Sequence, residues 1–124
     1  MSEFAKHISL QVRDQEGTAY TVWLAVAEPN ETGTLSILTP AGKVTQQFEL
    51  THLRRAKDGT QLTCHVSGAA ATLSLERAKN PPELHVSASL FFPIFEAVYQ
   101  IDPTEQGRFI EWIVALRIGV LASS

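Results

Sequence analysis

A cysteine and a histidine on neighbouring predicted strands offer the most specific chemistry in this chain of 124 residues. The stretch LRRAKDGTQL reads as a β-hairpin whose loop is either Asp-Gly or Lys-Asp-Gly, and paired residues in a hairpin share a face. The two-residue loop would pair apolar residues with polar ones, so we favour the three-residue loop. That loop pairs Leu50 with Val66, Thr51 with His65, and His52 with Cys64.

In that register His52 faces Cys64, which is the arrangement of a cysteine nucleophile beside its general base. The sequence offers no third group to orient the imidazole and no Gly-rich oxyanion loop after Cys64. Free cysteine is also among the residue types most often buried in cores. We therefore predict no catalytic residue, and a thiol-dependent enzyme is the distant alternative.

The candidate metal ligands are four histidines, each on a different predicted strand: His7, His52, His65 and His85. In the favoured register His65 and His85 could share a face, which gives two ligands at most. A zinc site uses three or four ligands, so the sequence predicts no metal. The chain also lacks the Gly-rich phosphate-binding and nucleophile-elbow motifs, and we expect no cofactor.

Short runs in which apolar and polar residues alternate must position these side chains. Seven such runs, with an eighth at 95–101, are separated by turns that contain Gly, Pro, Asn and Asp. We predict one mainly β domain over 1–124, with strands over about 7–101 and a C-terminal helix over about 103–121. The expected fold is an antiparallel up-and-down β-barrel or highly curved sheet of seven to eight strands. One C-terminal α-helix packs on it or caps it.

Charge and composition exclude several classes of partner. The net charge is −3 and basic residues are scattered, so no nucleic-acid-binding face is expected. The apolar segment 109–122 is too short to span a membrane and contains Glu111 and Arg117. Because there is one cysteine and no apolar run of signal-peptide length near the start, we predict a cytoplasmic protein.

The densest aromatic stretch is SLFFPIF at 89–95. Pro93 cannot donate to a central ladder, so this stretch marks an edge, a bulge or a barrel corner. Its side chains either fill the core or line a pocket, because a barrel of about eight strands has room for one small molecule. The candidate residues for binding a small apolar ligand are Phe91, Phe92, Phe95 and Tyr99.

The C-terminal helix has a well-marked start, and it carries more apolar surface than a helix usually buries when it packs on one sheet. Asp102 is an N-cap, Pro103 takes the first helical position, and Glu105 completes a capping box. Projected at ~100° per residue, the apolar residues form two stripes rather than one. The first stripe consists of Phe109, Ile113, Leu116 and Val120, and the second of Ile110, Val114 and Leu121.

Three arrangements would account for the second stripe. The helix could plug a barrel end, it could offer the second stripe to a partner, or it could end early so that Ile118 onward runs as a strand. We favour the second arrangement because exposed apolar patches usually mark interaction sites. The partner is then a second copy of this chain, as a homodimer, or another protein. The predicted interface consists of Ile110, Val114, Arg117, Ile118 and Leu121.

Two families show a local resemblance at the C-terminus. EWIVALR at 111–117 resembles the end of a pleckstrin-homology domain, and VYQIDPTEQGRFIEWI at 98–113 resembles the last strand and helix of a PilZ domain. Cyclic-dinucleotide-binding PilZ domains carry R-x-x-x-R and [DN]-x-S-x-x-G, whereas here Arg54 and Arg55 are adjacent and HVSGAA lacks the acidic residue and final glycine. The PilZ resemblance thus implies protein interaction rather than nucleotide binding. The basic first-hairpin residues with which pleckstrin-like domains bind phosphoinositides are absent, and no site residue is carried over from either family.

The predicted function is a non-catalytic binding or interaction module that self-associates or docks a protein partner through the apolar C-terminal helix. The alternative is a small β-barrel that binds an apolar small molecule.

Overall fold

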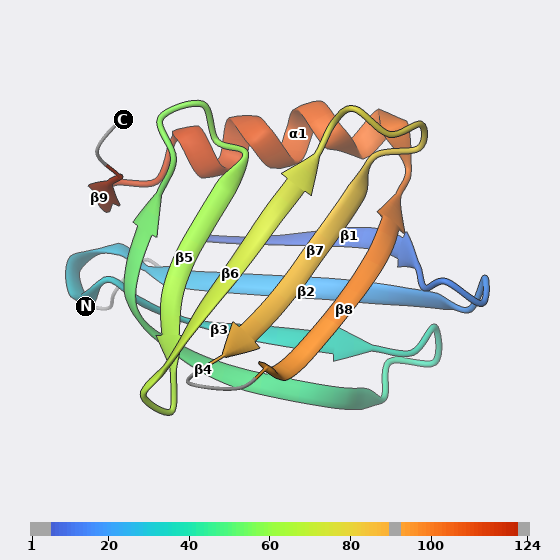
Figure 1. Ribbon diagram of the computed structural model, residues 1–124, viewed down its shortest axis with the longest axis horizontal. Coiled ribbons are helices and arrows are strands. Elements are labelled where there is room, and N and C mark those ends of the chain that lie inside the picture. The colour runs from blue at the N-terminus through green and yellow to red at the C-terminus, as the bar shows by residue number, and fades with distance from the viewer. Residues whose placement is uncertain (1–5, 90–92, 122–124) are drawn as a thin grey trace.

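Eight antiparallel strands follow one another around a closed barrel in the computed structural model, which describes residues 6–89 and 93–121 (Figure 1). Each strand pairs with the next one along the chain, and β8 returns to β1. The predicted antiparallel barrel is confirmed. The barrel strands are β1 (Lys6–Arg13), β2 (Ala19–Ala27), β3 (Thr32–Leu38), β4 (Val44–Arg55), β5 (Gln61–Val66), β6 (Ala69–Glu76), β7 (Glu83–Ser89) and β8 (Pro93–Ile101).

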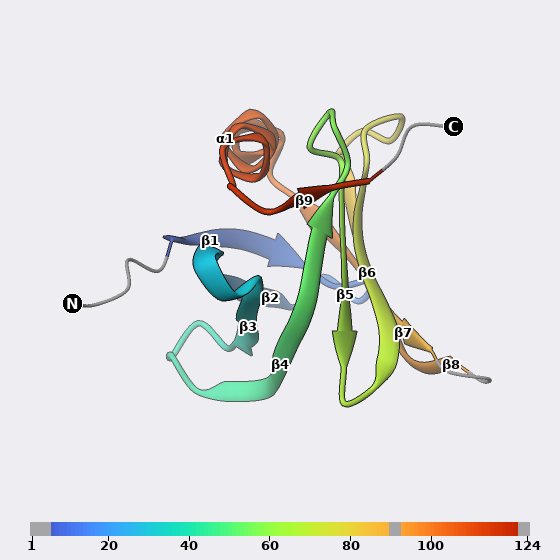
Figure 2. The same ribbon diagram turned by 90° about the vertical axis from the view of Figure 1, so that its left-hand side faces the viewer.

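Three further elements complete the described chain. A 3₁₀ turn, η1 (Glu28–Asn30), joins β2 to β3, and helix α1 (Pro103–Val114) follows β8. A short strand, β9 (Gly119–Val120), then pairs in parallel with the end of β4. Figure 2 shows α1 end-on above β1, so the single C-terminal helix covers one end of the barrel.

The interior is formed by the apolar members of the alternating runs. In β1, for example, Ile8, Leu10 and Val12 are buried, while the residues between them are exposed. Within the described residues, the interior between Leu35 and Val86 keeps a hollow of about 10 Å³. A single water needs at least about that much space, so this part of the barrel is a packed core.

The barrel is one closed sheet folded into two halves, which act as two sheets, and strand β4 passes from the half with β1–β3 to the half with β5–β8 at a bulge. Its first half pairs with β3 and its last residues pair with β5 and β9. Between these halves His52 takes a left-handed backbone conformation (φ 55°), and the Leu53 N–H bonds to the Glu31 carbonyl at 3.0 Å. Figure 1 accordingly shows β1–β3 running across the direction of β5–β8.

The barrel closes where β1 and β8 pair over a short stretch, which we call the seam. Where this pairing ends, α1 packs beside β1. The seam has two residue pairs, Val12 with Ile101 and Arg13 with Gln100. Beyond it, the Gln11 N–H donates to Glu105 Oε1 at 3.0 Å, and Arg108 Nη2 donates to the Ser9 carbonyl at 2.6 Å. Helix side chains therefore satisfy backbone groups of β1 that a neighbouring strand would otherwise bind.

The start of α1 follows the prediction only in part. Asp102 is the N-cap, and its carboxylate accepts a hydrogen bond from the Thr104 N–H at 3.0 Å. The Thr104 hydroxyl donates to the same carboxylate oxygen at 3.0 Å, and the two hydrogen bonds from Thr104 lower the pKa of Asp102. The expected capping-box bond of Glu105 is replaced by its bond to β1, because the carboxylate reaches the free Gln11 N–H.

The helix ends at Val114, so the predicted extent to 121 is wrong. Two carboxylates of the β2–β3 connection draw the following residues away from the helix. Glu28 accepts a hydrogen bond from the Arg117 N–H at 2.7 Å, and Glu31 accepts one from the Gly119 N–H at 3.0 Å. These charge-assisted bonds favour an extended path over further helical turns. The chain after α1 thus takes the third arrangement considered for it, an early end followed by a strand.

The turn between β4 and β5 contacts the second stripe of the helix and covers part of it. A Cβ atom added at Gly59 would lie 2.7 Å from Val114 Cγ2, 2.9 Å from the Ile110 carbonyl oxygen and 3.1 Å from Ile110 Cγ2. Ile110 is half-buried, whereas Phe109 and Ile113 on the first stripe are fully buried in the core. The helix therefore caps the barrel with one stripe and abuts a hairpin turn with the other.

This contact predicts unequal effects of adding a methyl group at two glycines with positive φ. At Gly17 (φ 87°) the added Cβ meets no atom within 4 Å, whereas at Gly59 (φ 78°) it meets the helix. Gly17→Ala should cost about 1–2 kcal/mol of unfolding free energy for the left-handed conformation. Gly59→Ala should cost about 1–3 kcal/mol more, because the helix must move. Urea unfolding of both variants measures the difference, and equal losses would contradict the contact.

Candidate functional site

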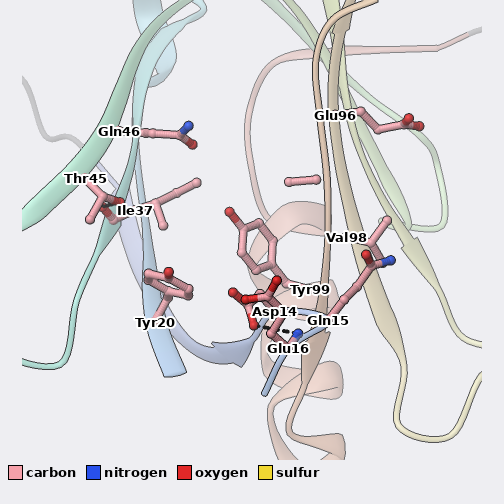
Figure 3. A pocket seen from close by; sticks show the side chains of 11 residues that line it. Asp14, Gln15, Glu16, Tyr20, Ile37, Thr45, Gln46, Glu96, Val98 and Tyr99 are labelled. Atoms are coloured by element: carbon pink, nitrogen blue, oxygen red, sulfur yellow. Dashed lines mark hydrogen bonds between the residues drawn. The ribbon is translucent and has the colours of Figure 1, made fainter. Parts of the chain in front are cut away.

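A cleft of about 460 Å³ lies beside the seam, between β8 on one side and β2, β3 and β4 on the other. One wall carries Tyr20, Ile37, Thr45 and Gln46, and Tyr99 projects into the cleft from β8 opposite them (Figure 3). The β1–β2 turn, residues 14–16, lies at one end. Because the walls are strands, their positions are fixed by pairing on both sides of the cleft.

Two tyrosines form the aromatic part of this cleft. The rings of Tyr20 and Tyr99 meet edge to face, with centroids 6.3 Å apart and planes at 75°. Tyr99 is buried, and burial, with smaller contributions from Tyr20 and Asp14, raises the pKa of its hydroxyl above the usual value. The Tyr99 side chain therefore stays neutral at physiological pH and is available as a hydrogen-bond donor.

The charged residues that line the cleft are all acidic: Asp14, Glu16 and Glu96. The Asp14 carboxylate is committed to its turn, where it accepts hydrogen bonds from the N–H groups of Glu16 and Thr18, both at 2.9 Å. Glu96 projects from the side of β8 opposite to Tyr99 (Figure 3). Glu16 is exposed on the β1–β2 turn and places a negative charge at the mouth of the cleft, while the nearby Arg13 guanidinium is bound to the Gly17 carbonyl at 3.1 Å.

The predicted pairing of His52 with Cys64 is wrong. Thr51 pairs with His65 as expected, but the bulge shifts the register so that Arg54 pairs with Thr63, and the turn contains four residues, 57–60. The backbone of His52 is in the left-handed conformation and its side chain is exposed, away from the core. The centroid of its ring lies 4.7 Å from that of His65.

Cys64 is a buried core residue opposite Ala71 on β6. Burial raises the pKa of the Cys64 thiol to about 11. That shift is the opposite of the one that activates a nucleophilic cysteine.

No family model, no curated protein and no solved structure matches this chain. The resemblances to pleckstrin-homology and PilZ domains gain no support from these comparisons. No helix in the described parts of the chain is long and apolar enough to cross a membrane.

The predicted ligand-binding residues have different outcomes. Phe91 and Phe92 lie outside the described residues. Phe95 belongs to β8, where its backbone pairs with Ala88. Tyr99 lines the cleft described above. The interior hollow between Leu35 and Val86 measures about 10 Å³, whereas the cleft lined by Tyr99 measures about 460 Å³. Binding of a small apolar ligand by these four residues stays a prediction.

The predicted interface residues do not form one helical stripe, because α1 ends before three of them. Ile118 is buried, Ile110 and Leu121 are half-buried, and Val114 and Arg117 are exposed. Self-association through these residues stays a prediction, but its premise of a continuous exposed apolar face is wrong.

Sequence reasoning missed a group of three side chains on the β6–β7 hairpin. One ligand atom from each of Glu76, Glu83 and His85 lies within 4.8 Å of the others. The sequence prediction pairs His85 with another histidine only. A local signal for the glutamate was present in the sequence, since Glu83 and His85 are two residues apart and so share a face of one strand.

The raised pKa of Cys64 predicts a loss of stability in alkali. The thiol of the unfolded chain ionises near its ordinary pKa of 9.0, whereas the folded thiol keeps its proton up to about 11. Between these values the folded state binds more protons, so its stability falls as pH rises. From pH 9 to 11 the wild type should lose about 2 kcal/mol more unfolding free energy than Cys64→Ala. Urea unfolding across this range measures it, and parallel pH profiles would contradict the assignment.

Proposed function

We propose that this protein binds a small organic cation that carries an aromatic or apolar group, and that the ligand occupies the cleft between β8 and β2–β4. The observation that carries the proposal is the composition of the cleft. It combines the Tyr20–Tyr99 pair with an acidic turn, and no lysine or arginine is among its lining residues.

The size and chemistry of the cleft suit such a ligand. A volume of about 460 Å³ falls within the range typical of small-molecule sites. Tyrosine faces attract ammonium groups through their ring quadrupoles, and a nearby carboxylate adds an attractive charge. Glu16 supplies that charge without being required for the turn, because the turn is held by the carboxylate of Asp14.

The walls of the cleft are preorganised. Tyr20 pairs with Val12 in the β1–β2 ladder, and Tyr99 pairs with Leu84 in the β7–β8 ladder. Ile37 is buried between β2 and β4, so the apolar end of the cleft rests on the core. Rigid walls reduce the entropic cost of ordering the site when a ligand binds.

Phenethylamine is a suitable probe because it joins an ammonium group to a phenyl ring. Phenylacetate and 2-phenylethanol are its anionic and neutral counterparts. In ¹H–¹⁵N NMR titrations, phenethylamine should shift backbone signals around Tyr20 and Tyr99, and it should bind more tightly than either counterpart. Equal binding of phenylacetate, or shifts confined to other surfaces, would contradict the proposal.

Glu16→Gln tests the acidic part of the site. Removing the charge should weaken phenethylamine binding by roughly 2-fold to 5-fold, the range expected for loss of one exposed ion pair. Glu111→Gln is the matched control, because it removes the same charge from an exposed position on α1. If both variants bind like the wild type, the Glu16 carboxylate has no part in recognition.

A further inference from the structure

The β6–β7 hairpin brings two glutamates directly opposite each other beside a histidine. Glu76 pairs with Glu83 in the ladder, and His85 lies two residues after Glu83, opposite Ser74. Like charges at directly opposed positions of a sheet are destabilising. This pairing of two carboxylates therefore favours a cation between them, and Lys79, 3.8 Å from Glu83 Oε1, meets that preference only at one of the two.

The distances between the donor atoms suit a metal ion. His85 Nε2 lies 3.4 Å from Glu83 Oε1 and 3.9 Å from Glu76 Oε2. Tetrahedral bonds of about 2.0–2.2 Å place neighbouring donors roughly 3.3–3.6 Å apart. The spacing of His85 and Glu83 already fits this geometry. Glu76 is exposed and lies within 4.8 Å of the other two donors, so its side chain would have to move closer to share an ion.

The His85 ring nitrogen Nε2 faces the two glutamate carboxylates at 3.4 and 3.9 Å without a hydrogen bond to any described residue. Nε2 is shielded from solvent and makes no hydrogen bond, although the rest of the side chain is partly exposed. Buried polar nitrogens nearly always have a partner. A neutral imidazole with its proton on Nδ1 directs the Nε2 lone pair at the space between the carboxylates, where a metal ion would sit.

We propose that Glu76, Glu83 and His85 form a binding site for a divalent transition-metal ion of the Zn²⁺ class. Three protein ligands with nitrogen and oxygen donors leave one position of a tetrahedral ion open to water. The Lys79 ammonium lies 3.8 Å from Glu83 Oε1 and competes with the metal for that carboxylate. The site shares no residue with the cleft, so it does not depend on the proposed function.

Calorimetric titration of the full chain with Zn²⁺ alone tests the site. The wild type should bind one ion, and His85→Asn, Glu76→Gln and Glu83→Gln should each weaken binding. Loss of a direct ligand should raise Kd by at least the roughly 10-fold to 100-fold that loss of an outer partner costs. Lys79→Gln should instead lower Kd, because it removes the competing cation.

Two histidine variants serve as controls. His7→Asn removes an exposed histidine on β1, and His52→Asn disrupts the His52–His65 ring pair, the other place where two imidazoles lie close enough to bind Zn²⁺ together. Both should bind Zn²⁺ like the wild type, and histidine ring NMR signals should shift on Zn²⁺ addition at His85 alone. Absence of saturable binding, an unchanged Kd for His85→Asn, or loss of binding in His52→Asn would overturn the proposal.

Discussion

The short seam between β1 and β8 is the constraint on which the rest of this barrel depends. Two residue pairs close the ring of strands, and on either side of them the two sheets separate. On one side α1 fills the gap, and Glu105 and Arg108 bind the backbone of β1 in place of a strand. On the other side the gap stays open as the cleft between Tyr99 and Tyr20. The helix seat and the candidate binding site are thus two results of one limited contact.

A second constraint lies in β4, which belongs to both sheets. The left-handed conformation of His52 lets the strand turn, so that its first half completes one sheet and its end completes the other. The Leu53 N–H, freed from the ladder by the bulge, is satisfied by the Glu31 carbonyl. The same glutamate binds Arg54 and the Gly119 N–H through its carboxylate. The bend of the barrel and the path of the C-terminal segment are therefore held at one place.

The sequence allowed the fold to be predicted where the signal was local. Alternation such as that of Ile8, Leu10 and Val12 records the burial of one strand face, and Asp102 caps the helix within its own turn. The end of the helix could not be predicted, because it depends on carboxylates 88 and 89 residues away in the chain. The bulge at His52 was missed for a related reason. Histidine is enriched among non-Gly residues with positive φ, but such residues are so uncommon that the residue type alone does not predict the conformation, and tertiary pairing decides it. The cleft gathers one turn and four strands, and no sequence window contains it.

The way in which η1 and Glu31 hold the C-terminal segment has an evolutionary consequence. Both carboxylates bind main-chain N–H groups, at Arg117 and Gly119, rather than side chains. Recognition of this kind fixes a path while leaving the identity of an exposed residue such as Arg117 free to drift. Gly119 is the exception, because the Arg54 side chain lies against its Cα and leaves no room for a Cβ. Divergent relatives of this protein should therefore retain Glu28, Glu31 and Gly119 longer than they retain the residues around them.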